Sequence, residues 1–196
     1  MNQFIATAKK AVMEAGKLLR VGFLKQHVLH YKVRRYEAPV TDVDLASEAK
    51  IRSIIRRAHP DHAILGEEHG MMNGHNSPYL WIVDPIDGTT NYAHGLPFFN
   101  VTIALQKNGR TLLGAVYQPL VDELFFAVRD RGAWLNRKRA CVSNEQNLHR
   151  AYGFIEWLPD NPTVNARGLE ILTRLRKKRV RIRNIGSGAL VFAYVG

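Results

Sequence analysis

The dipeptide Asn108-Gly109 separates two apolar runs, residues 101–105 and 112–117. Asn-Gly is preferred where both central residues of a tight turn need a positive φ, so the two runs are predicted to pair as an antiparallel hairpin. A third apolar run, residues 124–128, extends the hairpin into a meander. This arrangement is typical of an α+β unit and excludes strict alternation of strands and helices in this part of the chain.

Two helical patterns precede the meander. In residues 1–20, apolar side chains recur at helical spacing between charged ones, which predicts an amphipathic helix. A secretory signal or a membrane span needs an unbroken apolar segment, so we expect a cytoplasmic protein without a membrane anchor. The second pattern begins at Thr41 and ends before Pro60. Its first residues fit the helix-capping pattern, so the residues alone favour a capping role for Asp44.

The end of the chain follows a different pattern. Strand-like and helix-like segments alternate, which predicts a parallel sheet. These segments are a strand at 152–155, a helix at 169–178, a strand at 180–185 and a helix that begins at Gly186. We therefore expect an N-terminal α+β domain at 1–142 and the start of a C-terminal α/β domain at 143–196. No strand follows the last helix, so we expect the second domain to lack a returning strand and to be incomplete.

Basic residues outnumber acidic ones by 28 to 17, which gives a formal net charge of +11. This charge favours polyanions such as phosphorylated metabolites, nucleic acid or acidic membrane surfaces. Seven basic residues lie between Arg174 and Arg183, and we interpret them as a solvated surface, with a nucleic-acid site as the alternative. The single cysteine, Cys141, excludes an intrachain disulfide and fits a reducing compartment, and the histidines complete no zinc-ligand pattern.

Acidic residues follow two short apolar runs. Asp84 and Asp87 come after residues 79–83, and Glu67 comes after residues 63–65. Carboxylates that meet at strand ends repel one another unless hydrogen bonds or a cation compensate, and oxygen ligands of this kind suit Mg²⁺. The alternative is that Asp84 and Asp87 are only turn and capping residues. The residues alone do not decide between these interpretations.

The segment that contains these acids also predicts an anion site. Pro85 lacks a backbone donor, so strand pairing is expected to stop there. Gly88 permits an unusual backbone angle, and Thr89 or Thr90 is expected to cap a short helix. The free N–H groups at the start of that helix favour a phosphate.

The string Asp84-Pro85-Ile86-Asp87-Gly88-Thr89-Thr90-Asn91 closely resembles the signature of the inositol monophosphatase family. Shorter similarities run along nearly the whole chain. They are Val40-Thr41 through Asp44, Leu65-Gly66-Glu67-Glu68, Gly114-Ala115-Val116-Tyr117, Gly132-Ala133 and Gly186-Ser187-Gly188-Ala189. The chain resembles in particular the bacterial extragenic-suppressor type and the archaeal inositol monophosphatase/fructose-1,6-bisphosphatase type.

This resemblance implies a layered α-β-α-β-α sandwich of the sugar phosphatase type. It also implies a metal and phosphate site in the N-terminal domain with two or three Mg²⁺ ions. The implied ligands of the first ion are Glu67, Asp84 and the carbonyl of Ile86, and those of the second are Asp84 and Asp87.

The resemblance further implies that Asp44 and Thr89 position and activate an attacking water. The implied substrate-binding residues are Asp87, Gly88, Thr89, Thr90, Gly186, Ser187 and Gly188. The expected function is Mg²⁺-dependent hydrolysis of a small phosphate monoester, with myo-inositol 1-phosphate as the expected substrate. Fructose 1,6-bisphosphate and 3'-phosphoadenosine phosphates are the alternatives.

Members of the family that resemble this chain are expected to form homodimers. Bacterial members also act in RNA transcription complexes, so an RNA-binding regulatory protein with vestigial activity is the alternative from another class. The family pattern continues beyond residue 196 to a substrate-contacting acid and to a Trp-Asp motif that binds the second metal. If residues 1–196 are the whole molecule, it is expected to hydrolyse phosphate esters poorly or not at all. The alternative is that the chain is a fragment of a longer, active protein.

Overall fold

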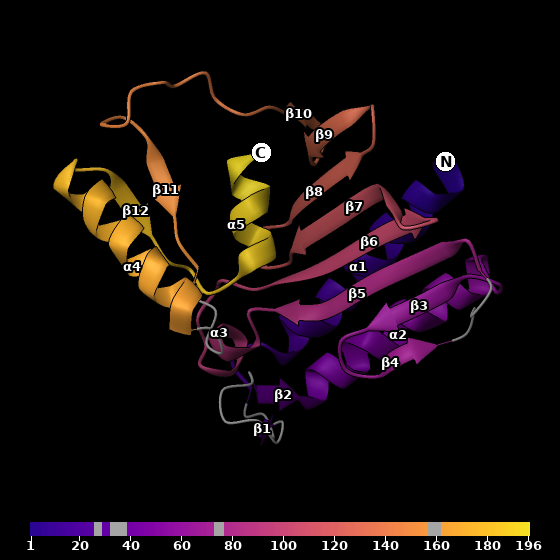
Figure 1. Ribbon diagram of the computed structural model, residues 1–196. Coiled ribbons are helices and arrows are strands. Elements are labelled where there is room, and N and C mark those ends of the chain that lie inside the picture. Colours follow the sequence, from indigo (N-terminus) through magenta and orange to yellow (C-terminus); the bar gives the residue numbers. More distant parts are fainter. Residues whose placement is uncertain (26–28, 32–38, 73–76, 157–161) are drawn as a thin grey trace.

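The computed structural model describes residues 1–25, 29–31, 39–72, 77–156 and 162–196, and an eight-stranded mixed sheet forms its largest layer (Figure 1). The strands lie in the order β10-β9-β8-β7-β6-β5-β3-β4. Their bounds are β3 (Ala63–Gly66), β4 (Gly70–Met72), β5 (Tyr79–Asp87), β6 (Asn100–Lys107), β7 (Arg110–Gln118), β8 (Glu123–Val128), β9 (Gly132–Leu135) and β10 (Lys138–Ala140). Neighbouring strands are antiparallel except β3 and β5, which run parallel.

The predicted meander is confirmed. Asn108 and Gly109 connect β6 to β7, and both have a positive φ, 49° and 74°. Strands β6, β7 and β8 then pair in sequence order, so each strand packs beside its neighbour in the chain.

Two helices, α1 (Asn2–Gly22) and α2 (Asp42–Ala58), cover one face of the sheet (Figure 1). They confirm both helices predicted before the meander. α1 contacts β6 and β7, and α2 contacts β5. The interface between the two layers is the hydrophobic core, whose fully buried side chains include Leu19, Ile55 and Ile103. Of the helices in the described ranges, none is long and apolar enough to span a membrane.

The C-terminal segment begins with a smaller unit made of β11 (Tyr152–Phe154), α4 (Pro162–Lys177) and β12 (Arg181–Arg183). It continues with α5 (Gly188–Val195), which contacts β5, β6 and β7 of the large sheet. β11 and β12 pair in parallel, which confirms the predicted parallel sheet. β12 is the strand predicted at 180–185, and the expected incompleteness of the second domain beyond the last helix stays a prediction. Residues 141–147, where a domain boundary is predicted, have no regular secondary structure, and the division into two domains stays a prediction.

Pairing along β5 does not stop at Pro85, contrary to the sequence prediction. Asp84 lies opposite Thr102 and Asp87 lies opposite Asn100, with a register shift between the two pairs. The bulge accommodates the missing N–H of Pro85, and the ladder resumes after it. Because of the bulge, β5 continues two residues beyond Pro85, and Asp87 is paired within the sheet.

The short helix α3 (Thr89–Ala93) follows β5, but neither threonine caps it. The N-cap residue is Gly88, whose φ is 93°, and it makes no side-chain hydrogen bond. The predicted cap by Thr89 or Thr90 is therefore wrong. Thr89 is the first helical residue, and its hydroxyl donates back to the Ile86 carbonyl at 2.8 Å. A further two-stranded sheet, β1 (Leu29–Tyr31) with β2 (Pro39–Thr41), precedes α2.

Candidate functional site

The parallel pair β3 and β5 brings Glu67 and Asp84 together. Gly66 lies opposite Val83, and the N–H of Glu67 donates to the Val83 carbonyl at 3.2 Å. Parallel strands end at the same edge of a sheet, so the residues that follow these two positions are neighbours. The Asp84 atom Oδ1 is buried and, within the described residues, has no hydrogen-bond partner.

The electrostatic environment of Asp84 disfavours a bare negative charge. The pKa of Asp84 is raised to about 9, first by burial and then by the charges of Glu67 and Asp87. A hydrogen bond with Glu67 and the charge of Asp44 act the same way. A cation beside Asp84 Oδ1 would remove these penalties, because it attracts the ionised carboxylate that burial and repulsion disfavour.

Asp44 lies in the first turn of α2 and is almost completely buried. Its Oδ2 accepts hydrogen bonds from the N–H and the hydroxyl of Thr41, at 2.8 and 2.6 Å. The predicted capping box is present. Its Oδ1 accepts from the Thr89 hydroxyl at 3.3 Å, so the carboxylate also reaches the start of α3. Burial raises the pKa of Asp44, and the hydrogen bonds from Thr41 and Thr89 partly offset that rise.

Asp87 is turned toward the start of α5. Its carboxylate accepts from the Asn100 amide at 2.7 Å, the Ser187 hydroxyl at 2.6 Å, and the N–H groups of Gly188 and Ala189 at 3.2 and 2.9 Å. Three of these donors bond to Oδ2 and only the Gly188 N–H bonds to Oδ1, so Oδ1 keeps room for a further partner. Asp87 therefore joins the large sheet to the C-terminal unit, across about 100 residues of sequence.

Three of the expected substrate-binding residues, Gly186, Ser187 and Gly188, thus meet Asp87, Gly88 and Thr89 at one place. A Cβ at Gly88 would lie 2.7 Å from the Phe98 carbonyl and 3.3 Å from the Gly186 carbonyl, so only glycine fits there. The hydroxyl of Ser187 is buried and bonded to Asp87. Thr90 is exposed at the surface of α3.

The expected ligands fit one divalent cation better than two. In the described part of the chain, no three His, Cys, Asp or Glu side chains are close enough to form a ready-made metal cage. Glu67 and Asp84 nevertheless present adjacent carboxylates with one orphaned buried oxygen, a donor set that suits Mg²⁺. The Ile86 carbonyl, which accepts from the Thr89 hydroxyl at 2.8 Å, follows in the bulge. Asp87 offers Oδ1, which accepts one hydrogen bond, from the Gly188 N–H at 3.2 Å, within the described residues.

Sequence reasoning missed a second set of residues that holds Glu67 in place. Glu48 is fully buried on α2, and its carboxylate accepts from the N–H groups of Glu68 and His69 at 2.8 and 3.2 Å. Arg52 donates to Glu48 at 2.7 Å and to the Gly70 carbonyl at 2.6 Å. The sequence contains a signal for this set, because Glu48 and Arg52 are oppositely charged residues four positions apart on the face of α2 that also carries Ile51.

Asn91 was also missed, although it lies inside the signature string. Its amide donates to the carbonyls of Phe98 and Ile185, both at 2.7 Å. The side chain therefore connects α3 to the segment that enters α5. Nothing in its position along the sequence indicates this long-range partner.

The sequence matches the profile of the inositol monophosphatase family over residues 1–196. The chain belongs to this family. Similar curated relatives include the Nus factor SuhB of Pasteurella multocida, 35% identical over 195 residues that cover 100% of this chain and 73% of the relative. Another is the fructose-1,6-bisphosphatase/inositol-1-monophosphatase of Aquifex aeolicus, 36% identical over 79% of this chain and 59% of the relative.

Solved structures of inositol monophosphatase family members confirm the fold class. The extragenic suppressor protein SuhB of Bartonella henselae matches with a TM-score of 0.85 and 33% identity, over 98% of this chain and 74% of that one. The Thermotoga maritima IMPase matches with the same TM-score and identity, over 100% of this chain and 72% of that one. The layered α+β architecture predicted from the sequence is therefore the fold of this chain.

Proposed function

We propose that this chain is a Mg²⁺-dependent phosphatase that hydrolyses a small phosphate monoester, with myo-inositol 1-phosphate as the expected substrate. The observation that carries the proposal is the orphaned, buried Oδ1 of Asp84 beside the Glu67 carboxylate. A folded protein rarely tolerates such a group without a partner, and a divalent cation supplies one.

In this proposal Glu67, Asp84 and the Ile86 carbonyl hold one Mg²⁺, and Asp84 and Asp87 hold a second. Bound Mg²⁺ supplies Lewis acidity, which lowers the pKa of a bound water and stabilises negative charge on the leaving oxygen. The chain itself fixes the ligands. The pairing of β3 with β5 sets the spacing of Glu67 and Asp84. Ile86 and Asp87 follow Asp84 in the bulge of β5.

Thr89 and Asp44 orient the attacking water. The Thr89 hydroxyl donates its proton to the Ile86 carbonyl and faces Asp44 at 3.3 Å, so its own oxygen is left to accept a hydrogen bond from a water. When the Thr89 hydroxyl turns to Asp44, it can pass its proton to the carboxylate while its oxygen takes a proton from the water. This arrangement suits general-base assistance, whose efficiency depends on the geometry of the base and on its pKa.

The phosphate lies at the turn between β5 and α3. The backbone N–H groups of Gly88 and Thr89 lie at the start of α3, where N–H groups have no partner within the helix and an anion is stabilised. Gly186, Ser187 and Gly188 would line the other side, and the bonds of Ser187 and Gly188 to Asp87 support a position of the organic part of the substrate near α5. Fructose 1,6-bisphosphate and 3'-phosphoadenosine phosphates are the alternative substrates, and a homodimer is the proposed assembly.

The direct test is phosphate release from myo-inositol 1-phosphate with and without Mg²⁺. Asp84→Asn is expected to lower turnover by about 10²- to 10³-fold, because it removes a charge that the transition state requires. Asp130→Asn is the matched control, since Asp130 is exposed in a turn with φ 61°, which asparagine also tolerates. Unchanged turnover in Asp84→Asn, or turnover that does not depend on Mg²⁺, contradicts the proposal.

The seven basic residues between Arg174 and Arg183 support a second candidate function, RNA binding within a transcription complex. Relatives of this chain are named Nus factors, and Arg176, Lys177 and Arg179 are exposed around the end of α4. Arg183 lies over the ring of Tyr152, at 5.4 Å from its centroid, and Tyr152 is half exposed. Cations beside an exposed aromatic ring are typical of surfaces that bind single-stranded nucleic acid.

This candidate predicts RNA binding that weakens steeply as salt rises. Charge reversal of Arg176, Lys177 and Arg179 is expected to abolish it, while Asp84→Asn leaves it unchanged. A fluorescence-anisotropy titration with a short single-stranded RNA measures both. Binding that is absent, or that survives the charge reversal, removes the candidate.

A further inference from the structure

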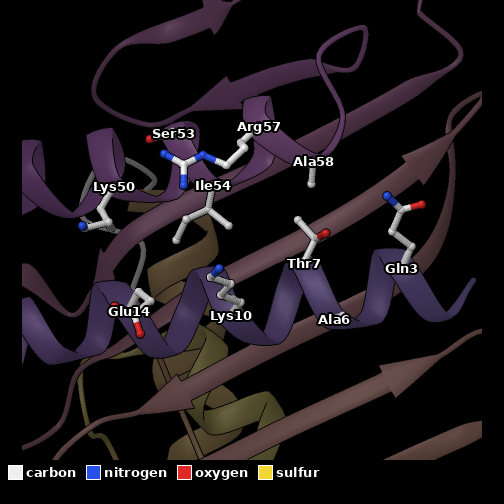
Figure 2. Close-up of a pocket in the computed structure, with 10 residues that line it drawn as sticks. All are labelled: Gln3, Ala6, Thr7, Lys10, Glu14, Lys50, Ser53, Ile54, Arg57 and Ala58. Carbon is white, nitrogen blue, oxygen red and sulfur yellow. The ribbon is translucent and has the colours of Figure 1, made fainter.

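A groove between α1 and α2 collects positive charge on the side of the helix layer that faces away from the sheet. Its volume is 340 Å³, within the range of small-molecule sites. The residues that line it are Gln3, Ala6, Thr7, Lys10, Glu14, Lys50, Ser53, Ile54, Arg57 and Ala58. Figure 2 shows Lys10 on α1 and Arg57 on α2 at opposite sides of the gap between the helices, with Arg57 lying along α2 toward Ser53.

The positions follow from helical spacing. Lys50, Ser53 and Arg57 recur at intervals of three and four residues, so they share one face of α2. The opposite face carries Asp44 and Glu48, which are buried toward the sheet and the candidate site. Lys50 and Arg57 are six and thirteen residues beyond Asp44, so they lie about 9 and 20 Å along the helix from it. The groove is therefore separate from the candidate site.

The groove holds more positive than negative charge. Lys10, Lys50 and Arg57 are exposed, and within the described residues no salt bridge or side-chain hydrogen bond engages any of the three. The one carboxylate of the lining, Glu14, is bonded to Lys17 at 2.6 Å. The pKa of Glu14 is lowered, first by that hydrogen bond and also by the charges of Lys50 and Lys10. The lining thus contains three cations and one carboxylate that is already paired.

We propose that this groove is a binding site for a small phosphorylated metabolite, with the phosphate between Lys10, Lys50 and Arg57. A phosphate monoester carries a charge of about −2 near neutral pH, which complements the excess of positive over negative side chains in the groove. The Ser53 hydroxyl and the Gln3 amide are hydrogen-bond donors at its rim, and Ile54 and Ala58 line it with apolar surface. The lining has no aromatic side chain on which a base could stack, which favours a small metabolite over single-stranded RNA.

The experiment is an amide-shift titration of the ¹⁵N-labelled chain with glycerol 3-phosphate, in EDTA so that no divalent cation recruits phosphate to the acidic site. Inorganic phosphate is titrated in parallel, and chloride at equal ionic strength is the blank. We expect saturable shifts at Lys10, Ser53 and Arg57, with tighter binding of glycerol 3-phosphate than of inorganic phosphate.

The double variant Lys50→Gln/Arg57→Gln is expected to weaken binding at least tenfold. The matched control, Arg110→Gln/Arg131→Gln, removes the same charge from exposed positions outside the groove and is expected to change it less than twofold. Equal weakening in both variants overturns the proposal, because it means that only net charge matters. Shifts confined to residues 174–183 or to Gly88 and Thr89 overturn it as well, as does binding of a short RNA over the groove with no response to glycerol 3-phosphate.

Discussion

The large sheet with α1 and α2 and the smaller β11–α4–β12 unit differ in what they bury. In the first region, Trp81, Ile103 and Leu105 are fully enclosed between sheet and helices. In the second, within the described residues, α4 buries none of its side chains, and Leu169 is 54% exposed. Apolar burial is the main source of folding free energy, so the first region is expected to hold nearly all of the stability.

The candidate site follows the same division. Asp44, Glu67 and Asp84 belong to the first region, on elements that a buried core holds rigid. The segment after β12 reaches the site at Ile185, which accepts from Asn91, and at the start of α5, where Ser187 and Gly188 meet Asp87. The metal-binding chemistry is therefore predicted to survive perturbations of α4 that do not disturb α5.

The largest expected effect tests the difference in burial. Ile103→Ala should lower the free energy of unfolding by about 2–5 kcal/mol, because it removes buried methyl groups and leaves a cavity. Leu169→Ala on α4 should change it by less than about 0.5 kcal/mol. Urea denaturation of both variants measures the contrast. Equal losses would mean that the two regions share one core.

The next effect compares two Glu–Arg pairs with the same spacing of four residues, Glu48–Arg52 and Glu170–Arg174. The first is buried and holds the turn after Glu67, and the second is exposed on α4. Glu48→Gln should weaken Mg²⁺ binding about 10- to 100-fold, as loss of outer partners of metal ligands does. Glu170→Gln should leave it unchanged. Titration calorimetry measures the Mg²⁺ affinity of both variants. An unaltered affinity in Glu48→Gln would show that Glu48 does not position the metal ligands.

The smallest effect concerns the connection between the regions. Asn91→Ala removes the donor to Phe98 and Ile185, which should cost about 1 kcal/mol and make the amides of α5 exchange about fivefold faster. Asn184→Ala removes a similar bond to Ile155 outside α5 and should not change those rates. Equal exchange of α5 in both variants and in the parent chain would show that Asn91 does not anchor it.

Much of the fold is predictable from local sequence because the local signals agree with the tertiary structure. The Asn108-Gly109 turn and the apolar spacing of residues 1–20 each determine their own geometry. The short strands β4, β9 and β10 were missed, because three or four residues give too little periodicity. The predicted end of strand pairing at Pro85 was wrong because a β-bulge accommodates the missing N–H of Pro85, and the bulge depends on the partner strand.

The candidate site is less predictable than the fold. The string that contains Asp84 and Asp87 resembles a family signature, so the identities of the acids are visible in the sequence. The partners of these acids are not visible in the sequence. Asp87 accepts from the N–H of Ala189, 102 residues away, and Glu48 accepts from the N–H of Glu68 because α2 packs against the sheet. The direction in which a carboxylate points is set by these tertiary contacts.

The central claim is that Glu67 and Asp84 form a cation site. Because the pKa of Asp84 is raised in the folded chain to about 9, well above its unfolded value, the folded state binds the extra proton. Without metal, stability must therefore be lost as pH rises from about 4 toward 9.

The decisive measurement is the free energy of unfolding between pH 7 and 9, with and without saturating Mg²⁺. The parent chain should lose stability with rising pH in EDTA, and Mg²⁺ should stabilise it increasingly with pH, by about 2.7 kcal/mol at a hundredfold excess over its Kd. Asp84→Asn should show neither the loss nor the Mg²⁺ effect. The same pH dependence in both proteins, with no stabilisation by Mg²⁺, contradicts the claim.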